Sequence, residues 1–143
     1  MKPSIHRVFG IVATLVVLGT VVWGFTKAGA PEARRAERMD ERRLEDLQTI
    51  HSEILELVRD PDRPGALRAA LPSTLAEVAS KATRRKISTM DPETNEPYEY
   101  RVTGASTYVL CATFARPRDA SDHVFWNHGS GRACFTLDAL NPP

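Results

Sequence analysis

The first pattern along the chain is a long apolar run near the amino end. The run VFGIVATLVVLGTVVWGF carries no charge and is flanked by Arg7 and Lys27. A helix of about 20 residues spans the ~30 Å hydrocarbon layer, and basic side chains at its ends reach the headgroups. Trp23 and Phe25 stand at one end, where aromatic rings prefer the interface. The pattern predicts a transmembrane helix over residues 8–26, with these four side chains as its interface anchors.

A cleaved secretory signal is the alternative interpretation of this run. Ala28-Gly29-Ala30 has the small-x-small form of a cleavage site. Pro31 would follow the cut, where the peptidase tolerates proline poorly. The sequence therefore favours a retained anchor over a cleaved signal.

Small residues recur in the span at helical spacing. Gly10 and Thr14 are four positions apart, and so are Thr20 and Gly24. Such pairs let a neighbouring membrane helix approach closely, whereas a plain lipid-facing anchor has no need of them. Both interpretations stay open, with the lipid bilayer and other membrane subunits as the expected partners.

A second helical pattern begins at Pro31 and continues without glycine or further proline to Arg59. Its apolar stripe, at steps of three and four, consists of Leu44, Leu47, Ile50, His51, Ile54, Leu57 and Val58. This spacing predicts a long amphipathic helix, with His51 as a partly buried core or interface residue rather than a ligand. The preceding residues are polar all round, so we expect residues 27–43 to form a charged helical stalk with a solvated face.

The chain then changes period. After the proline-rich loop DPDRPGALRAALP, Thr74 and Glu77 have capping-box spacing and predict a short helix. Further on, apolar and polar residues alternate in YEYRV and again in YVLCATF, with TGAS between them as a turn. This alternation predicts an antiparallel hairpin, and a third strand is expected over residues 132–137.

The predicted fold class is therefore α+β, with a long helix packed on a three-to-four-stranded antiparallel sheet. Its expected boundaries are a tail over 1–7, the span over 8–26, the stalk over 27–43 and the domain over 44–143. Cys111 and Cys134 fall in the second and third strands and are expected to form a disulfide. The bridge closes a loop of about 22 residues and is worth roughly 3 kcal/mol by chain entropy.

Charge gives little evidence on partners and orientation. The net charge is +1, which gives no electrostatic reason to expect a nucleic-acid partner. The basic residues on the two sides of the span are nearly balanced, so the positive-inside rule does not decide the orientation. An isolated cysteine pair is typical of an oxidising compartment. We therefore expect a cytoplasmic amino end and an extracytoplasmic domain.

One turn contains candidate metal ligands. Asp91, Glu93 and Asn95 match the first ligand positions of a calcium loop, but Glu96 stands where that loop needs glycine. Prolines on both sides favour a structural turn.

The remaining chemistry is sparse. Cys111, His123, His128 and Cys134 lack the close-paired spacing of zinc motifs, and an oxidised pair supplies no thiolate. The chain contains no CxxCH and no recognisable catalytic triad order. We expect no enzyme activity and no cofactor. A ligand-binding sensor is a further class, for which a helix on three strands offers little room.

The order of these features resembles type IV pilins and type II secretion pseudopilins. The motifs that carry the resemblance are Leu71-Pro72, Asp91-Pro92 and Pro97-Tyr98-Glu99-Tyr100. It implies a long amino-terminal helix packed on a small antiparallel sheet. The sequence is more similar still to uncharacterised bacterial single-span proteins with a DLQ.I helix, a DP.T..PYEYRV segment and LCATF.

The sequence departs from the pilin pattern at the processing site. Gly10 precedes isoleucine rather than phenylalanine, Gly24-Phe25 lies at the wrong end of the span, and the span has no glutamate for assembly. We therefore expect an accessory or scaffold subunit of a bacterial inner-membrane complex with a periplasmic domain. The alternative is a pseudopilin-like filament subunit.

Overall fold

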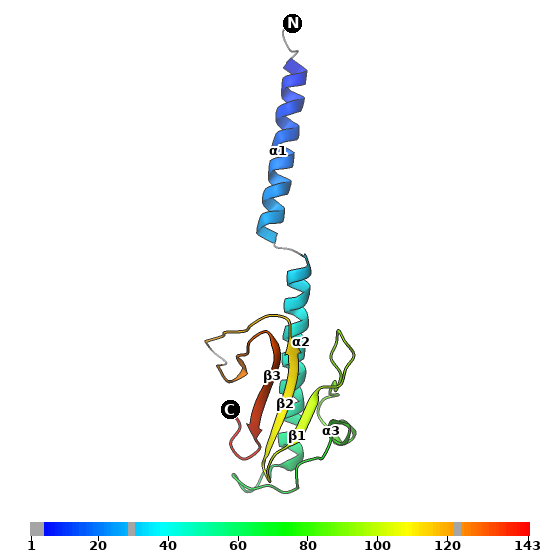
Figure 1. Cartoon of the computed structure of the whole chain (residues 1–143), viewed down its shortest axis with the longest axis vertical. Coiled ribbons are helices and arrows are strands. Elements are labelled where there is room, and N and C mark those ends of the chain that lie inside the picture. Colours follow the sequence, from blue (N-terminus) through cyan, green and yellow to red (C-terminus); the bar gives the residue numbers. More distant parts are fainter. Residues whose placement is uncertain (1–4, 29–30, 122–123) are drawn as a thin grey trace. The chain divides into compact units, whose positions relative to one another are not determined.

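The computed structural model describes residues 5–28, 31–121 and 124–143, with side chains of the first helix over 6–24. The elements, shown in Figure 1, are α1 (Ile5–Ala28), α2 (Pro31–Val58), α3 (Leu75–Lys81), β1 (Glu99–Val102), β2 (Thr107–Phe114), the 3-10 turn η1 (Val124–Trp126) and β3 (Gly131–Asp138). The chain divides into two compact units, residues 1–35 and 36–143. Each unit is described by itself.

The first unit contains α1, which is apolar all round. From His6 to Gly24 its mean hydropathy is 1.9, and none of this stretch is buried. Phe9, for example, is 76% exposed. Within the described residues, α1 is the one helix long and apolar enough to cross a membrane. A membrane span and a signal sequence both have this length and composition.

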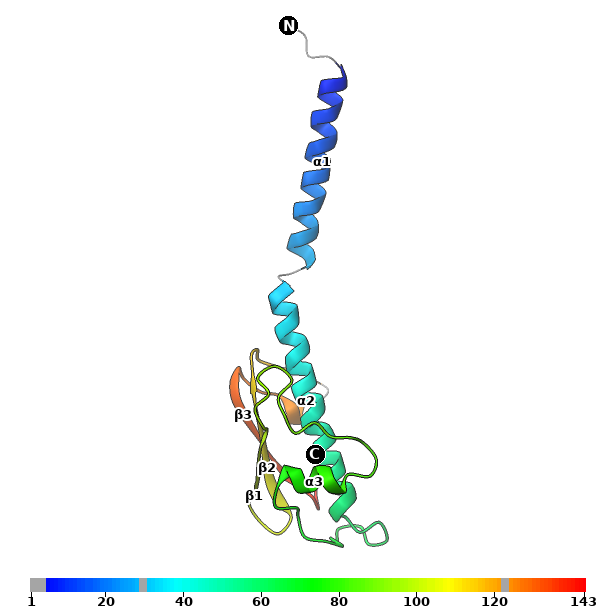
Figure 2. The same ribbon diagram turned by 90° about the vertical axis from the view of Figure 1, so that its right-hand side faces the viewer.

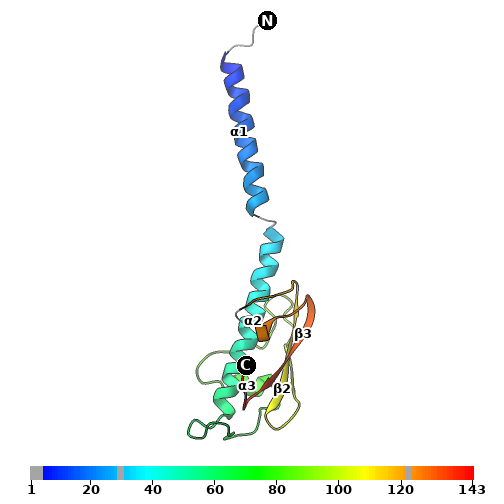
Figure 3. The same ribbon diagram turned by 90° about the vertical axis from the view of Figure 1, so that its left-hand side faces the viewer.

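The second unit is a two-layer α+β arrangement. Figures 2 and 3 show the sheet nearly edge-on, with α2 along one of its faces. The predicted stripe of α2 forms the helical side of the core, and Leu47, Ile50 and Ile54 have no exposed surface. Leu57 is the one member of that stripe that is only partly buried. The prediction of a long amphipathic helix packed on a sheet is therefore confirmed.

The sheet of the described chain has three strands in the order β1-β2-β3, all antiparallel. Its register pairs Tyr108 with Val102 on one side and with Leu137 on the other. Because side chains alternate along a strand, the register points Tyr108, Leu110 and Phe114 toward α2. The predicted hairpin and third strand are both confirmed.

The short helix α3 lies on the β1 side of the sheet (Figure 1). Thr74 is its N-cap, and the Thr74 hydroxyl accepts a hydrogen bond from the Glu77 backbone N–H at 3.2 Å. The Glu77 carboxylate accepts in return from the Ser73 backbone N–H at 2.8 Å, one residue earlier than in a capping box. Leu75 and Val78 bury the apolar face of α3 in the core.

Candidate functional site

A buried arginine connects α2 to the turn at residues 91–95. Arg43 is 3% exposed, and its Nε donates to Asp91 Oδ2 at 2.5 Å. Its Nη1 donates to Asp40 Oδ1 at 2.8 Å, and its Nη2 donates to Glu93 Oε2 at 2.8 Å and to Asp91 Oδ1 at 3.1 Å. The planar guanidinium therefore serves three carboxylates at once, a geometry that lysine cannot reproduce. The expectation of a solvated face over residues 27–43 is wrong for Asp40 and Arg43, because this network buries them.

The two ends of the network are fixed by backbone hydrogen bonds. Asp91 Oδ1 accepts from the backbone N–H groups of Glu93 at 2.8 Å and Thr94 at 3.0 Å. Burial raises the pKa of Asp91, but the hydrogen bonds from Arg43 and from these N–H groups outweigh it and lower the pKa to about 2. Asn95 completes the turn with a φ of 58°, in the left-handed region that asparagine tolerates. The segment therefore forms the predicted turn.

Asp40 extends the network to the end of β2. Its carboxylate oxygens accept from the backbone N–H groups of Ala115 and Arg116, both at 2.9 Å. One cluster therefore connects α2, the 91–95 turn and the exit of β2. Its chemistry is that of a structural clamp, since the guanidinium and carboxylates satisfy one another.

The two cysteines form the predicted bridge. Cys111 and Cys134 are directly opposite one another in the register of β2 and β3, with a Cα–Cα distance of 4.1 Å. The bridge lies on the face of the sheet opposite α2. Beside it, Arg132 makes two 2.7 Å hydrogen bonds to the carboxylate of Glu99 on β1. The disulfide prediction is confirmed in pairing and in position.

His123 and His128 were considered as zinc ligands, and His51 was expected in the core or at an interface. His128 stacks on Phe114 with a ring-centroid distance of 3.6 Å, and His123 lies outside the described residues. Among the described side chains, no group of three or more metal-ligating residues is found. His51 is 8% exposed, and its Nδ1 is 2.6 Å from the Tyr108 hydroxyl oxygen. His51 is therefore a core residue, one of the two positions predicted for it, and burial lowers its pKa to about 4, so the ring is neutral at pH 7.

The candidate anchor and packing positions lie on exposed helix surface where they are described. Arg7, Gly10, Thr14, Thr20, Trp23 and Gly24 are exposed, and the side chains of Phe25 and Lys27 lie outside the described residues. Thr14 donates its hydroxyl to the Gly10 carbonyl at 2.9 Å, and Thr20 donates to the Val17 carbonyl at 2.8 Å. Both hydroxyls are thus satisfied within α1, and the small positions remain available to lipid or to a neighbouring helix.

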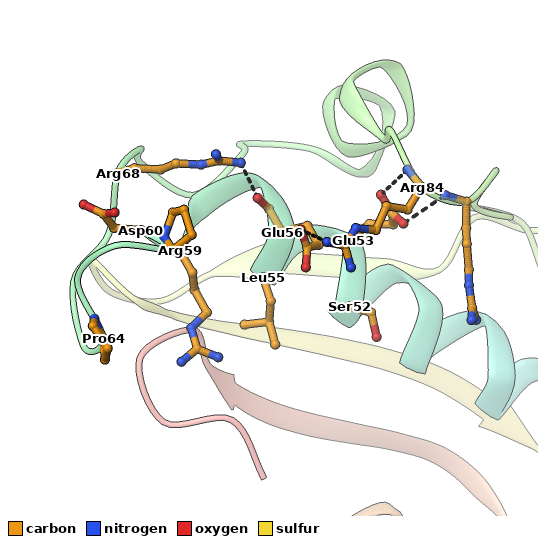
Figure 4. Close-up of a pocket in the computed structure, with 11 residues that line it drawn as sticks. Ser52, Glu53, Leu55, Glu56, Arg59, Asp60, Pro64, Arg68 and Arg84 are labelled. Carbon is orange, nitrogen blue, oxygen red and sulfur yellow. Dashed lines mark hydrogen bonds and ion pairs between the residues drawn. The ribbon is translucent and has the colours of Figure 1, made fainter.

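A pocket of about 600 Å³ opens at the carboxyl-terminal end of α2. Figure 4 shows its wall, which combines the last turns of α2 with the proline-rich loop and the segment after α3. Four arginines line it: Arg59, Arg68, Arg84 and Arg85. The expectation was that a helix on three strands offers little room for a ligand, and this pocket lies among loops beside α2 rather than between the helix and the sheet. This site was not predicted from the sequence, although two features could have indicated it: Glu53 within the apolar face of α2 and the basic cluster TRRK.

The pocket is organised around a buried carboxylate. Glu53 is 2% exposed. Its oxygens accept from the backbone N–H groups of Thr83 at 3.3 Å, Arg84 at 3.5 Å and Arg85 at 3.0 Å. These bonds hold the segment that carries Arg84 and Arg85 against α2.

Comparison with known proteins gives no relative from which a function follows. No family model, no curated protein and no solved structure matches the chain. The function therefore has to be argued from the residues themselves.

Proposed function

We propose that the protein is a non-enzymatic, single-span membrane protein that presents its α+β domain in the periplasm. We further propose that it serves as an accessory or scaffold subunit of a larger complex in the bacterial inner membrane. The main support is α1, whose apolar side chains from His6 to Gly24 are wholly unburied. A surface of this kind is unfavourable in water and requires lipid or a protein partner.

The placement of the domain has separate support. The Cys111–Cys134 bridge joins β2 to β3 on the face of the sheet opposite α2, and structural disulfides persist in oxidising compartments such as the periplasm. The described side chains present a clamp and a bridge in place of a catalytic arrangement. These features favour a stable presented domain over an enzyme.

Copurification from native membranes tests the proposal. The tagged full chain, extracted in mild detergent, is expected to bring down a second membrane protein. Gly10→Leu with Thr14→Leu should weaken that association if this face packs on a neighbour, because leucine holds the helices apart. Gly19→Leu is the matched control, since Gly19 is also exposed and belongs to neither small-residue pair.

Three results distinguish the alternatives. Recovery of the wild-type chain only as a monomer contradicts the accessory-subunit role. Two freely alkylated cysteines in the native protein contradict the periplasmic location. Absence of the residues before the span from the mature protein instead favours the pseudopilin-like filament subunit.

A further inference from the structure

The four arginines of the pocket at the end of α2 differ in their partners. Arg84 Nη2 is 3.1 Å from Glu56 Oε2, so its charge is already paired. Arg68 donates to the backbone carbonyls of Leu57, at 3.1 Å, and of Glu56, and so caps the last turn of α2. Figure 4 shows Arg68 extending toward Glu56, whereas Arg59 extends away from it. The guanidinium groups of Arg68 and Arg84 therefore already have partners within the domain.

Arg59 and Arg85 are the other two arginines of the pocket. Within the described residues neither guanidinium makes a hydrogen bond or an ion pair, although both line the pocket and Arg59 is half-buried. Neither of the nearby carboxylates, Glu53 and Asp60, forms an ion pair with Arg59 or Arg85 in the described residues. Glu53 is bonded to three backbone N–H groups, and Asp60 Oδ1 accepts from the Asp62 backbone N–H at 3.0 Å.

We propose that this pocket binds a small ligand that carries an oxyanion, of phosphate or carboxylate chemistry, with Arg59 and Arg85 as its cationic contacts. A guanidinium presents a rigid fork of N–H donors that matches either group, and charge-assisted hydrogen bonds of this kind are strong. The volume of about 600 Å³ lies within the range of small-molecule sites. The inference does not depend on the proposed role in a membrane complex.

Two other residues tune this site. Glu53 is a positioning residue, because its hydrogen bonds to the backbone hold Arg85 at the pocket wall. Glu56 competes with the ligand for Arg84 through the 3.1 Å ion pair. Removing the Glu56 charge therefore frees a third guanidinium and should strengthen binding.

Calorimetric titration of the full chain in neutral-detergent micelles tests the site, with inorganic phosphate in one arm and citrate in the other. Low salt is used because surface charges are screened by ions. Binding is expected in at least one arm, which identifies the preferred oxyanion chemistry. Arg59→Gln with Arg85→Gln should weaken it by about tenfold or more, as expected when hydrogen bonds to a charged group are lost. Glu56→Gln should strengthen it several-fold.

The matched control is Arg63→Gln, an exposed arginine of the same loop that does not line the pocket. It should leave the affinity unchanged. The proposal is overturned if neither probe binds at millimolar concentration, or if the double variant and Arg63→Gln lose affinity equally. If the double variant does not fold, Arg85→Gln alone replaces it, since that exposed side chain makes no hydrogen bond or ion pair among the described residues. Unchanged affinity in Arg85→Gln then overturns the assignment.

Discussion

Replacement of Arg43 by methionine removes the cation that connects α2 to the 91–95 turn. Methionine preserves an unbranched side chain of adaptable shape but carries no charge. Asp40 and Asp91 are only 8% and 7% exposed, so both carboxylates remain buried without a counter-charge. The side chain of Glu93 is 40% exposed and can turn toward water.

The expected loss is about 3 kcal/mol of unfolding free energy. Removing one partner of a buried ion pair typically costs about 3–5 kcal/mol. Asp91 keeps its bonds to the N–H groups of Glu93 and Thr94, which places this case at the lower end. The pKa of Asp91 gives the total stabilisation that its carboxylate receives from Arg43 and these N–H groups together. Its lowering from 3.8 to about 2 corresponds to roughly 2 kcal/mol of stabilisation at neutral pH.

The lowered pKa of Asp91 also determines whether the unfolding free energy rises or falls with pH. A carboxyl group with a lowered pKa in the folded state stabilises the fold above its unfolded pKa of about 4. That contribution disappears as the pH falls toward 2, the folded-state pKa of Asp91. Without Arg43, burial raises the pKa of Asp91, so the acid transition of the variant should move to higher pH.

Urea unfolding of the full chain at pH 7 measures the effect. The chain has two tryptophans. In a Trp23→Phe background, the buried Trp126 therefore reports on the domain alone. Arg43→Met with Asp91→Asn should recover part of the loss, because asparagine needs no counter-charge and can still accept the hydrogen bonds of the turn. Exposed Arg42→Gln is the control. If Arg43→Met and Arg42→Gln unfold within about 1 kcal/mol of each other, the clamp does not stabilise the domain.

Other residues give independent predictions. Replacing Cys111 and Cys134 by serine should cost roughly 3 kcal/mol for their separation of 23 residues, and an unchanged urea midpoint would contradict this estimate. The pKa of His51 is lowered to about 4, so the unfolded chain binds the proton first and stability should decline as the pH falls from about 6.5 toward 4. His51→Gln should flatten that decline in pH-dependent unfolding, and an equal decline in the variant would assign it to another group. Arg118 Nε is buried without a partner among the described residues, so Arg118→Met should leave the unfolding free energy unchanged or raise it by up to about 1 kcal/mol. A clear loss in calorimetric melting of that variant would reveal a stabilising contact.

The elements of the fold were predictable because their signals are local. The stripe that begins at Leu44 depends only on helical spacing, and α3 starts where Thr74 can accept its N-terminal hydrogen bond. The alternation around Cys111 fixes which side chains face α2. The pairing of β2 with β3 then places the two cysteines opposite one another. The two helices and the β1–β2 hairpin need only neighbouring residues and a short turn, whereas β2 and β3 are joined by the longer segment 115–130.

The charged clusters were not predictable in the same way, because their partners are distant in sequence. Arg43 and Asp91 are 48 positions apart, and Glu53 binds backbone groups 30 to 32 positions later. In the sequence, Arg43 lies in a segment that is polar all round and therefore looks solvated. One signal was present nonetheless, since Asp40, Arg43 and Leu47 extend the buried stripe by the same steps of three and four. A charged residue within the buried stripe of a helix indicates a buried charge whose partner lies on a distant segment of the chain. This holds for Arg43 and for Glu53. Two charged side chains of α2 therefore bind later segments of the chain. Arg43 binds the 91–95 turn, and Glu53 binds the segment at the arginine-lined pocket.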